Sequence, residues 1–261
     1  MSEQTAAIET DGLTKRYGRD VLAVDDLDLA VKRGDVYGFL GPNGAGKTTT
    51  MRILTTLTKP TSGTASVAGI PVTDRAALTE RIGYLPAEPP VFDELTGREY
   101  LRYVARLREL DGEDVERRVE AYLDRFELAD ADRRIDGYST GMKKKLGVIG
   151  TILHDPDVLF LDEPTSGLDP RAARTMRETI ADLADREMTV FLSTHILPVA
   201  DELADRLGVI NEGRLVAEGS PAELKARAEA DDGDADLETV FLNVTRREET
   251  AREQTVTESN V

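Results

Sequence analysis

The sequence predicts an α/β fold with a largely parallel sheet, and two observations support this prediction. Short apolar runs typical of buried strands alternate along the chain with stretches of helical periodicity. One of these runs leads directly into a glycine-rich loop, which is followed by a segment with the character of a helix. We expect strands at 26–32, 36–40, 82–85, 158–161, 189–192 and 207–210, and a helix at about 48–57.

The first two strands are expected to differ in burial. Polar and apolar residues alternate over 26–32, which is typical of a strand with one face in the core. After a turn, residues 36–40 form an unbroken apolar run, which indicates a buried strand.

The stretch from about 88 to 156 has a different pattern. No strand signal interrupts it, and its apolar residues recur at helical spacing, as in Leu101, Val104 and Ala105 and in Val115, Val119, Tyr122, Leu123 and Phe126. We therefore expect a helical subdomain inserted into one domain spanning 1–230. The remaining residues, 231–261, are expected to form an acidic linker and a partly disordered C-terminal tail, preceded by a short helix from 221 to about 229. No internal repeat is visible.

The composition limits the class of protein. The chain has 261 residues, of which 40% are hydrophobic, and this content is sufficient for a substantial core. It has no cysteine, so disulfides and cysteine-bound zinc are excluded. Its N-terminus shows no signal-peptide pattern, and its longest apolar runs are far shorter than the about 20 residues that cross a bilayer.

The formal net charge of −17 disfavours binding to nucleic acid, because such binding depends on lysine and arginine contacts to phosphate. The same charge disfavours docking on anionic lipid. Abundant acidic residues combined with few lysines indicate adaptation to high salt, and an acidic cytosolic protein is the alternative interpretation.

The glycine-rich loop predicts a nucleotide phosphate site. Residues 41–48 fit the pattern G-x-x-x-x-G-K-[ST], and they lie between a predicted strand and a predicted helix, which is the expected context. Backbone N–H groups in such a loop point toward phosphates, Lys47 adds a positive charge for the β- and γ-phosphates, and the Thr48 hydroxyl can bind Mg²⁺. A glycine-rich turn without a ligand is the alternative. The predicted ATP-binding residues of this loop are Gly41, Pro42, Asn43, Gly44, Ala45, Gly46, Lys47, Thr48 and Thr49.

A second chemical signal is the apolar strand at 158–161, which ends in two carboxylates. Asp162 at the strand end is placed to hold Mg²⁺, together with Thr48. Glu163 is expected to orient or deprotonate the attacking water. Alone, such a strand end is most often an ordinary solvated edge, but with the phosphate loop it predicts hydrolysis of ATP.

Four further segments resemble the motifs of ABC ATPases. Residues 138–142 (YSTGM) resemble the signature motif, and 166–169 (SGLD) resemble the D-loop. Residues 193–195 (STH) resemble the switch-histidine motif, and 15–18 (KRYG) resemble the A-loop. All occur in family order and cover about residues 8–220.

This resemblance implies a P-loop NTPase core with an antiparallel β subdomain and an inserted α-helical subdomain. It implies that Tyr17 stacks on adenine and that His195 contacts the γ-phosphate as a catalytic residue alongside Glu163 and Lys47. It also implies a head-to-tail dimer with a second copy or a close paralogue. In that dimer each ATP is covered by the partner's signature segment. The residues through which this chain contacts the nucleotide of its partner are Ser139, Thr140, Gly141 and Asp169.

The resemblance further implies an ATP-hydrolysing subunit that powers a separate transmembrane permease, as a peripheral protein at the cytoplasmic face of the membrane. Residues 89–96 are apolar where a loop is expected, so they either dock the permease or pack the helical subdomain. Residues 237–245 (LETVFLNVT) resemble a C-terminal motif of the drug-resistance and multicomponent exporters, which favours export. The alternative is a soluble ABC ATPase of translation or nucleic-acid maintenance, which the charge and the lack of long heptad repeats disfavour.

Two departures from the family pattern affect the predicted site. Ala87 stands where the family has a glutamine that reaches the metal and the water, so either Glu88 substitutes for it or the contact is absent. Thr140 and Met142 replace the commoner glycine and glutamine of the signature. Two further observations carry less information. The lysines at 143–145 either raise the potential near the phosphates or form a solvated basic face, and His154 matches no motif and is interpreted as structural.

Overall fold

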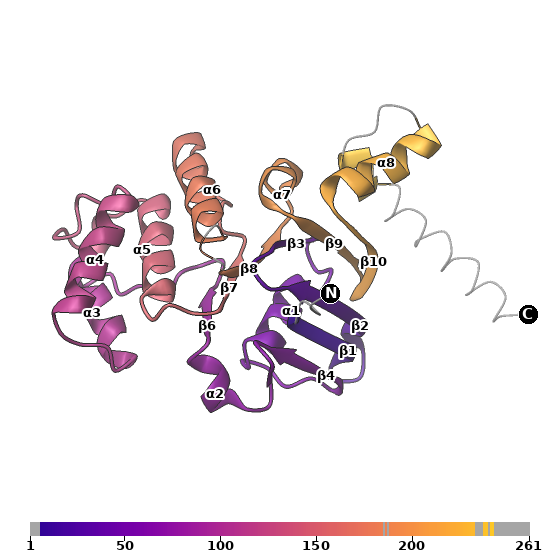
Figure 1. The fold of residues 1–261 in the computed structure, drawn as a ribbon, viewed down its shortest axis with the longest axis horizontal. Coiled ribbons are helices and arrows are strands. Elements are labelled where there is room, and N and C mark those ends of the chain that lie inside the picture. Colours follow the sequence, from indigo (N-terminus) through magenta and orange to yellow (C-terminus); the bar gives the residue numbers. More distant parts are fainter. Residues whose placement is uncertain (1–5, 185, 187, 233–236, 240, 243–261) are drawn as a thin grey trace, which may run out of the picture.

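The computed structural model describes residues 6–184, 186, 188–232, 237–239 and 241–242 (Figure 1). Within them the chain forms two sheets. The four-stranded sheet is antiparallel, has the order β2-β1-β4-β5, and contains β1 (Ala6–Tyr17), β2 (Val21–Lys32), β4 (Ser62–Val67) and β5 (Ile70–Pro71). The six-stranded sheet has the order β10-β9-β3-β8-β7-β6 and contains β3 (Val36–Leu40), β6 (Ile82–Leu85), β7 (Val158–Asp162), β8 (Thr189–Thr194), β9 (Arg206–Asn211) and β10 (Arg214–Gly219).

In the larger sheet the strands from β9 to β6 pair in parallel, and only β10 is antiparallel to its neighbour. Its central strands β3, β7 and β8 are buried throughout, as expected for parallel strands covered on both faces. The predicted α/β fold with an antiparallel β subdomain is therefore confirmed. The parallel pairing brings the carboxyl ends of β3, β7 and β8 to one edge of the sheet, where ligands bind in open α/β folds.

The long strand β1 differs from the sequence pattern. The alternation predicts a first strand only at 26–32, whereas β1 pairs with most of β2 and extends the sheet to Ala6. Several register shifts interrupt this pairing, including one between Thr10 and Leu13. Because each shift moves the following residues to the other face, the period of two is lost from the sequence.

The first helix, α1 (Lys47–Leu54), is shorter than the predicted 48–57. It ends because Thr56 has a positive φ of 63°, which turns the chain away from the helical path. Its apolar residues Met51, Ile53 and Leu54 are buried in one core with residues from both sheets, including Phe39 and Phe160. This packing fixes the start of α1 against the carboxyl end of β3.

The insertion is helical, as predicted. It contains α3 (Gly97–Leu107), α4 (Glu113–Arg125), the short 3-10 helix at Ile135–Gly137 and α5 (Thr140–Ile152), which gather at one end of the molecule, away from β1, β2 and β4 (Figure 1). Helix α3 begins with a complete capping box between Thr96 and Glu99. Helix α5 lies nearest the sheet and shares a core with β7 and β8.

The other helices are α2 (Arg75–Thr79), α6 (Pro170–Ala184), α7 (Leu197–Leu203) and α8 (Pro221–Asp232). Helix α8 continues to Asp232, which is three residues beyond the predicted end. Leu237 is buried in a cluster with Leu40 and Leu224, so at least this part of the predicted tail packs on the domain. The rest of that prediction, at 233–236 and 243–261, lies outside the described residues. None of the described helices is long and apolar enough to cross a membrane.

Candidate functional site

The phosphate loop connects the end of β3 to α1 in a conformation that requires glycine at two positions. Gly46 has a φ of 111°, and a Cβ added to it would lie 2.4 Å from the carbonyl oxygen of Ala23. A Cβ on Gly41 would lie 2.4 Å from the carbonyl oxygen of Ile210. The loop is therefore held tightly between β2 and β9, and α1 starts directly behind it.

Lys47, the first residue of α1, lies inside this loop. Its Nζ donates to the carbonyl oxygens of Gly41 and Pro42, at 2.6 and 3.2 Å, and lies 3.7 Å from Oε1 of Glu163. Burial lowers the pKa of Lys47, and the nearby carboxylates of Glu163 and Asp162 oppose this shift. The side chain is thus a buried cation held by the loop and by the end of β7.

Thr48 and Asp162 are brought together from opposite sides of the site. The Thr48 hydroxyl donates to Oδ2 of Asp162 at 3.0 Å, and the Ser193 hydroxyl donates to Oδ1 of the same carboxylate. Asp162 is buried at the end of β7. A hydroxyl beside a carboxylate is a pair of hard oxygen donors, which suits Mg²⁺. Among the described residues there is no cluster of three or more acidic, histidine or cysteine side chains that could hold a metal ion. Thr48 and Asp162 themselves supply two side-chain oxygens.

Glu163 follows Asp162 in a strained backbone conformation. Its φ is +50°, which is uncommon for a residue with a Cβ. Its N–H donates to the carbonyl oxygen and, at 3.2 Å, to the hydroxyl oxygen of Ser193. Its buried Oε2 lies 2.9 Å from Nδ1 of His195, which follows the end of β8. The carboxylate therefore lies between the cation of Lys47 and the imidazole of His195.

A pocket of about 200 Å³ lies beside these residues at the carboxyl edge of the large sheet, and the predicted site residues Gly41, Ala45 and His195 do not line it. It is lined by Ala23, Pro42, Asn43, Gly44, Gly46, Lys47, Thr48, Thr49, Ala87, Asp162 and Glu163. Ala87 is thus at the site, as its place in the sequence predicts, but its methyl group offers no ligand. Glu88 is exposed and does not line the pocket.

The remaining predicted site residues do not line this pocket. Tyr17 is 41% exposed at the end of β1, with Nζ of Lys15 lying 5.0 Å from the centre of its ring. Ser139 and Thr140 are exposed where α5 begins, and the Ser139 hydroxyl accepts from the N–H of Met142 at 3.2 Å. Gly141 is buried against Ala172, and Asp169 accepts from the N–H of that residue, where α6 begins.

Lys144 is a residue near the site whose role the sequence did not indicate. It is only 4% exposed, and its Nζ donates to the carbonyl oxygens of Glu163 and Ser166, at 2.7 and 2.6 Å. The interpretation of 143–145 as a solvated face is therefore wrong for Lys144. His154 lies away from the pocket with Nε2 at 3.0 Å from the carbonyl oxygen of Ile82, and burial lowers its pKa. This environment fits the structural interpretation of His154.

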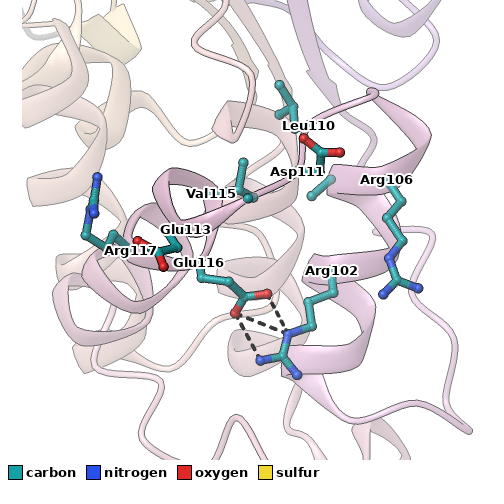
Figure 2. A pocket seen from close by; sticks show the side chains of 10 residues that line it. Arg102, Arg106, Leu110, Asp111, Glu113, Val115, Glu116 and Arg117 are labelled. Carbon is teal, nitrogen blue, oxygen red and sulfur yellow. Dashed lines mark hydrogen bonds and ion pairs between the residues drawn. The ribbon is translucent and has the colours of Figure 1, made fainter.

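A larger pocket, of about 670 Å³, lies between α3 and α4, but its charges are of a different kind (Figure 2). Arg102 from α3 donates three hydrogen bonds to the carboxylate of Glu116 from α4. This guanidinium is already paired, and the pocket is lined by both positive and negative side chains. The chemistry of a nucleotide site is concentrated instead at the end of β3.

The comparisons with known proteins agree with this geometry. The family model described as "ABC transporter" matches residues 24–166. The daunorubicin resistance ATP-binding protein DrrA3 of Streptomyces coeruleorubidus is 45% identical over 227 residues, covering 86% of this chain and 72% of the relative. The bacitracin transport ATP-binding protein BcrA of Bacillus licheniformis is 41% identical over 223 residues, covering 84% of this chain and 72% of the relative.

Solved structures show the same fold. An ATP-binding subunit of an ABC transporter superimposes with a TM-score of 0.82 at 29% identity, covering 92% of this chain and 99% of that structure. A dimeric ATP-binding cassette bound to ADP and Pi superimposes with a TM-score of 0.74 at 23% identity, covering 82% of this chain and 98% of that structure, which shows the shared fold. With its phosphate loop, paired carboxylates and sequence relatives, the chain belongs to the ABC transporter family and is an ATP-hydrolysing subunit of such a transporter.

Proposed function

We propose that this subunit uses ATP to drive export through a separate permease, from the cytoplasmic face of the membrane. The observation that carries the proposal is the polar cluster at the carboxyl edge of the sheet, where Lys47, Glu163 and His195 lie in one chain of contacts. Export is supported by relatives named for daunorubicin resistance and for Nod factor export. The resemblance of 237–245 to an exporter motif points in the same direction.

Binding of ATP begins at the phosphate loop. Residues of the loop and of the start of α1 line the pocket, and their N–H groups bind the phosphates together with the dipole of α1. Lys47 exchanges its contact with Glu163 for the β- and γ-phosphates. The ring of Tyr17 is exposed and offers adenine a surface for stacking.

A magnesium ion would be held by Thr48 and Asp162, whose oxygens already lie 3.0 Å apart. When bound, the ion neutralises charge on the phosphate oxygens during transfer. Ser193 keeps the Asp162 carboxylate oriented by donating to its other oxygen.

Hydrolysis depends on the release of Glu163 from its present contacts. Once phosphates occupy the loop, Lys47 and His195 turn to the γ-phosphate, and the Glu163 carboxylate is left to accept a proton from the attacking water. His195 is exposed enough to move, whereas Glu163 is largely buried and fixed by its backbone. His195 thus reports the presence of the γ-phosphate, and Glu163 acts on the water.

A second copy of the chain, or a close paralogue, completes the site. Ser139 and Thr140 are exposed at the N-terminus of the 13-residue helix α5 and do not line the pocket of their own chain. The exposed start of this helix suits the phosphates of a nucleotide bound to another chain. Asp169 lies next to this segment and belongs to the same face.

The permease surface includes part of the loop 89–96. Val91 and Leu95 pack against the helical core, so for them the packing alternative holds. Phe92 is 46% exposed and lies edge-to-face against the exposed Tyr103, with ring centres 5.5 Å apart. This exposed aromatic pair is the part of the loop that we assign to the permease.

The test is to recover the protein from its native membranes in high salt and mild detergent and to identify what co-purifies. Recovery of a membrane protein with several spanning segments is expected. A solute-binding protein in the same complex would instead indicate import. Recovery with ribosomes or nucleic acid alone would contradict the proposal.

We also infer that the acidic surface is an adaptation to high salt. With a net charge of −17, repulsion within the folded chain is reduced when salt screens it. The melting temperature is expected to rise steadily between about 0.1 and 2 M KCl. A rise that continues at the highest salt exceeds the stabilisation that Debye screening gives an ordinary acidic protein. A melting temperature that does not change over this range would favour the alternative of an ordinary acidic protein.

A further inference from the structure

The turn that carries Glu163 is held by a lysine from the helical subdomain. Residues 163–166 form a turn in which the N–H of Ser166 donates to the carbonyl oxygen of Glu163 at 3.2 Å. Lys144, on α5, donates to that same carbonyl oxygen and to the carbonyl oxygen of Ser166. The ammonium group therefore binds both ends of the turn.

Burial of the Lys144 ammonium group costs desolvation free energy, which other interactions must offset. Removing an ammonium group from water is strongly unfavourable, and burial lowers the pKa of Lys144 accordingly. Two short hydrogen bonds and the nearby carboxylates of Glu163 and Asp162 compensate for this cost. The neighbouring Lys145 is less buried and donates to the carbonyl oxygen of Phe126, within the helical subdomain. Position 144 thus differs from the next lysine in what it binds.

The turn needs such support because Glu163 has a left-handed backbone. Residues with a Cβ adopt a φ of +50° only where their surroundings hold them there. The N–H of Glu163 is fixed by Ser193, and its carbonyl group is fixed by Lys144 and Ser166. Without Lys144, the carbonyl oxygen of Glu163 loses its charged hydrogen-bond donor, and the direction of the Glu163 carboxylate becomes less well defined.

The same helix carries the signature segment, and its first turn packs against the chain that follows Glu163. A Cβ on Gly141 would lie 3.2 Å from that of Ala172 and 3.7 Å from the side chain of Leu168. The start of α5, the turn at 163–166 and the start of α6 therefore form one packed unit. A displacement of Ser139 by a bound nucleotide would reach Glu163 through this unit.

We propose that Lys144 is a positioning residue for Glu163, and that it links the signature segment of a chain to the catalytic carboxylate of the same chain. The proposal rests on the proposed function above, in which Ser139 covers the nucleotide of the second copy. It follows that ATP bound at one site aligns Glu163 at the other. Hydrolysis is then cooperative in ATP, and the cooperativity depends on Lys144.

The test is Lys144→Met, which keeps an unbranched side chain but removes the donor. We expect kcat for ATP hydrolysis to fall at least about tenfold, while KM for ATP changes by less than about twofold, because the lost interaction orients Glu163 rather than binding ATP. The Hill coefficient is expected to fall toward one. Lys144→Arg, which retains donors, should recover most of the loss.

The matched control is Lys145→Met, the next lysine on the same helix, which is expected to keep kcat, KM and the Hill coefficient of the unaltered protein. A Lys144→Met variant that folds and has an unchanged kcat would overturn the proposal, as would equal losses in both methionine variants. If Lys144→Met does not fold, Lys144→Gln decides by the same criteria of reduced kcat at unchanged KM.

Glu163→Gln, assayed in parallel, separates this proposal from the proposed function. If Glu163→Gln is inactive while Lys144→Met is fully active, only the positioning role fails. If Glu163→Gln is itself fully active, the assignment of Glu163 in the proposed function fails, and the role of Lys144 fails with it.

Discussion

Helices α1 and α5 both begin with a segment suited to binding an anion, but their surroundings differ. The start of α1 lies in a pocket with a buried lysine and two carboxylates from β7. The start of α5 is exposed at Ser139 and Thr140, and its buried lysine, Lys144, points to a backbone turn of its own chain instead of to a ligand. One helix start therefore belongs to a nearly complete site, and the other is exposed and does not line that pocket.

The difference teaches how one chain can contribute to two nucleotide sites. The carboxylates and the phosphate loop are brought together by the parallel order of β3, β8 and β7, which is a property of the single chain. The start of α5 is held by packing against the start of α6, and its residues Ser139 and Thr140 are exposed. We therefore expect substitutions at α1 and β7 to affect the chain's own nucleotide, and substitutions at the start of α5 to affect only the assembled dimer.

The largest effect is expected from Glu163→Gln. Loss of a general base lowers kcat by about 10²- to 10⁴-fold, and the neutral amide removes charge without changing the size of the side chain. Because binding is retained, ATP should trap the dimer, which size-exclusion chromatography would detect. Steady-state phosphate release within a few-fold of the unaltered protein would contradict the role of Glu163.

The second-largest effect is expected from Lys47→Ala, which tests the phosphate loop at the start of α1. A charged hydrogen bond contributes about 1.5–3 kcal/mol, so the dissociation constant for ATP should rise roughly 10- to 100-fold. The variant also removes the ammonium group that lies 3.7 Å from Oε1 of Glu163. Titration with a fluorescent ATP analogue at low protein concentration measures the change. An unchanged dissociation constant would show that the loop does not bind the phosphates through Lys47.

Ser139→Ala tests the exposed start of α5. Removal of a hydroxyl that contacts the partner's nucleotide should lower kcat by about tenfold, the size of one to two hydrogen bonds. The affinity of the separated chain for ATP should not change, because Ser139 does not line its own pocket. A loss of ATP affinity in the separated chain would mean that α5 acts on its own site, and the comparison would then fail.

The smallest effect is expected from Tyr17→Ala. Stacking of a base on an aromatic ring contributes about 1–3 kcal/mol, and the exposure of Tyr17 places it at the lower end, so KM for ATP should rise about fivefold with little change in kcat. Tyr17→Phe serves as the control and should behave like the unaltered protein. Equal KM values for the alanine and phenylalanine variants would show that the Tyr17 ring does not stack on adenine.

The sequence predicts the two regions unequally, for physical reasons. The phosphate loop and the carboxylates follow from local rules, since a fixed spacing of glycines and a strand ending in two acids determine their chemistry. Lys144 follows from no local rule, because it is one of three consecutive lysines and only tertiary packing decides which of them is buried. Strand β1 is not predicted from the sequence, because its register shifts remove the alternation of polar and apolar residues.

The most direct test of the central claim, that the start of α5 completes the site of a second copy, is to mix two variants that are each nearly inactive at an ATP concentration well below the dissociation constant of Lys47→Ala. Lys47→Ala damages the chain's own phosphate loop, and Ser139→Arg blocks the exposed start of α5. In a one-to-one mixture half of the dimers are mixed, and each mixed dimer has one intact site, which sets an upper limit of about a quarter of the normal ATPase activity. Because the Glu163 of that site belongs to the chain with the blocked α5, we predict activity clearly above that of either variant alone but below this limit. A mixture that stays as inactive as its two components would contradict the claim.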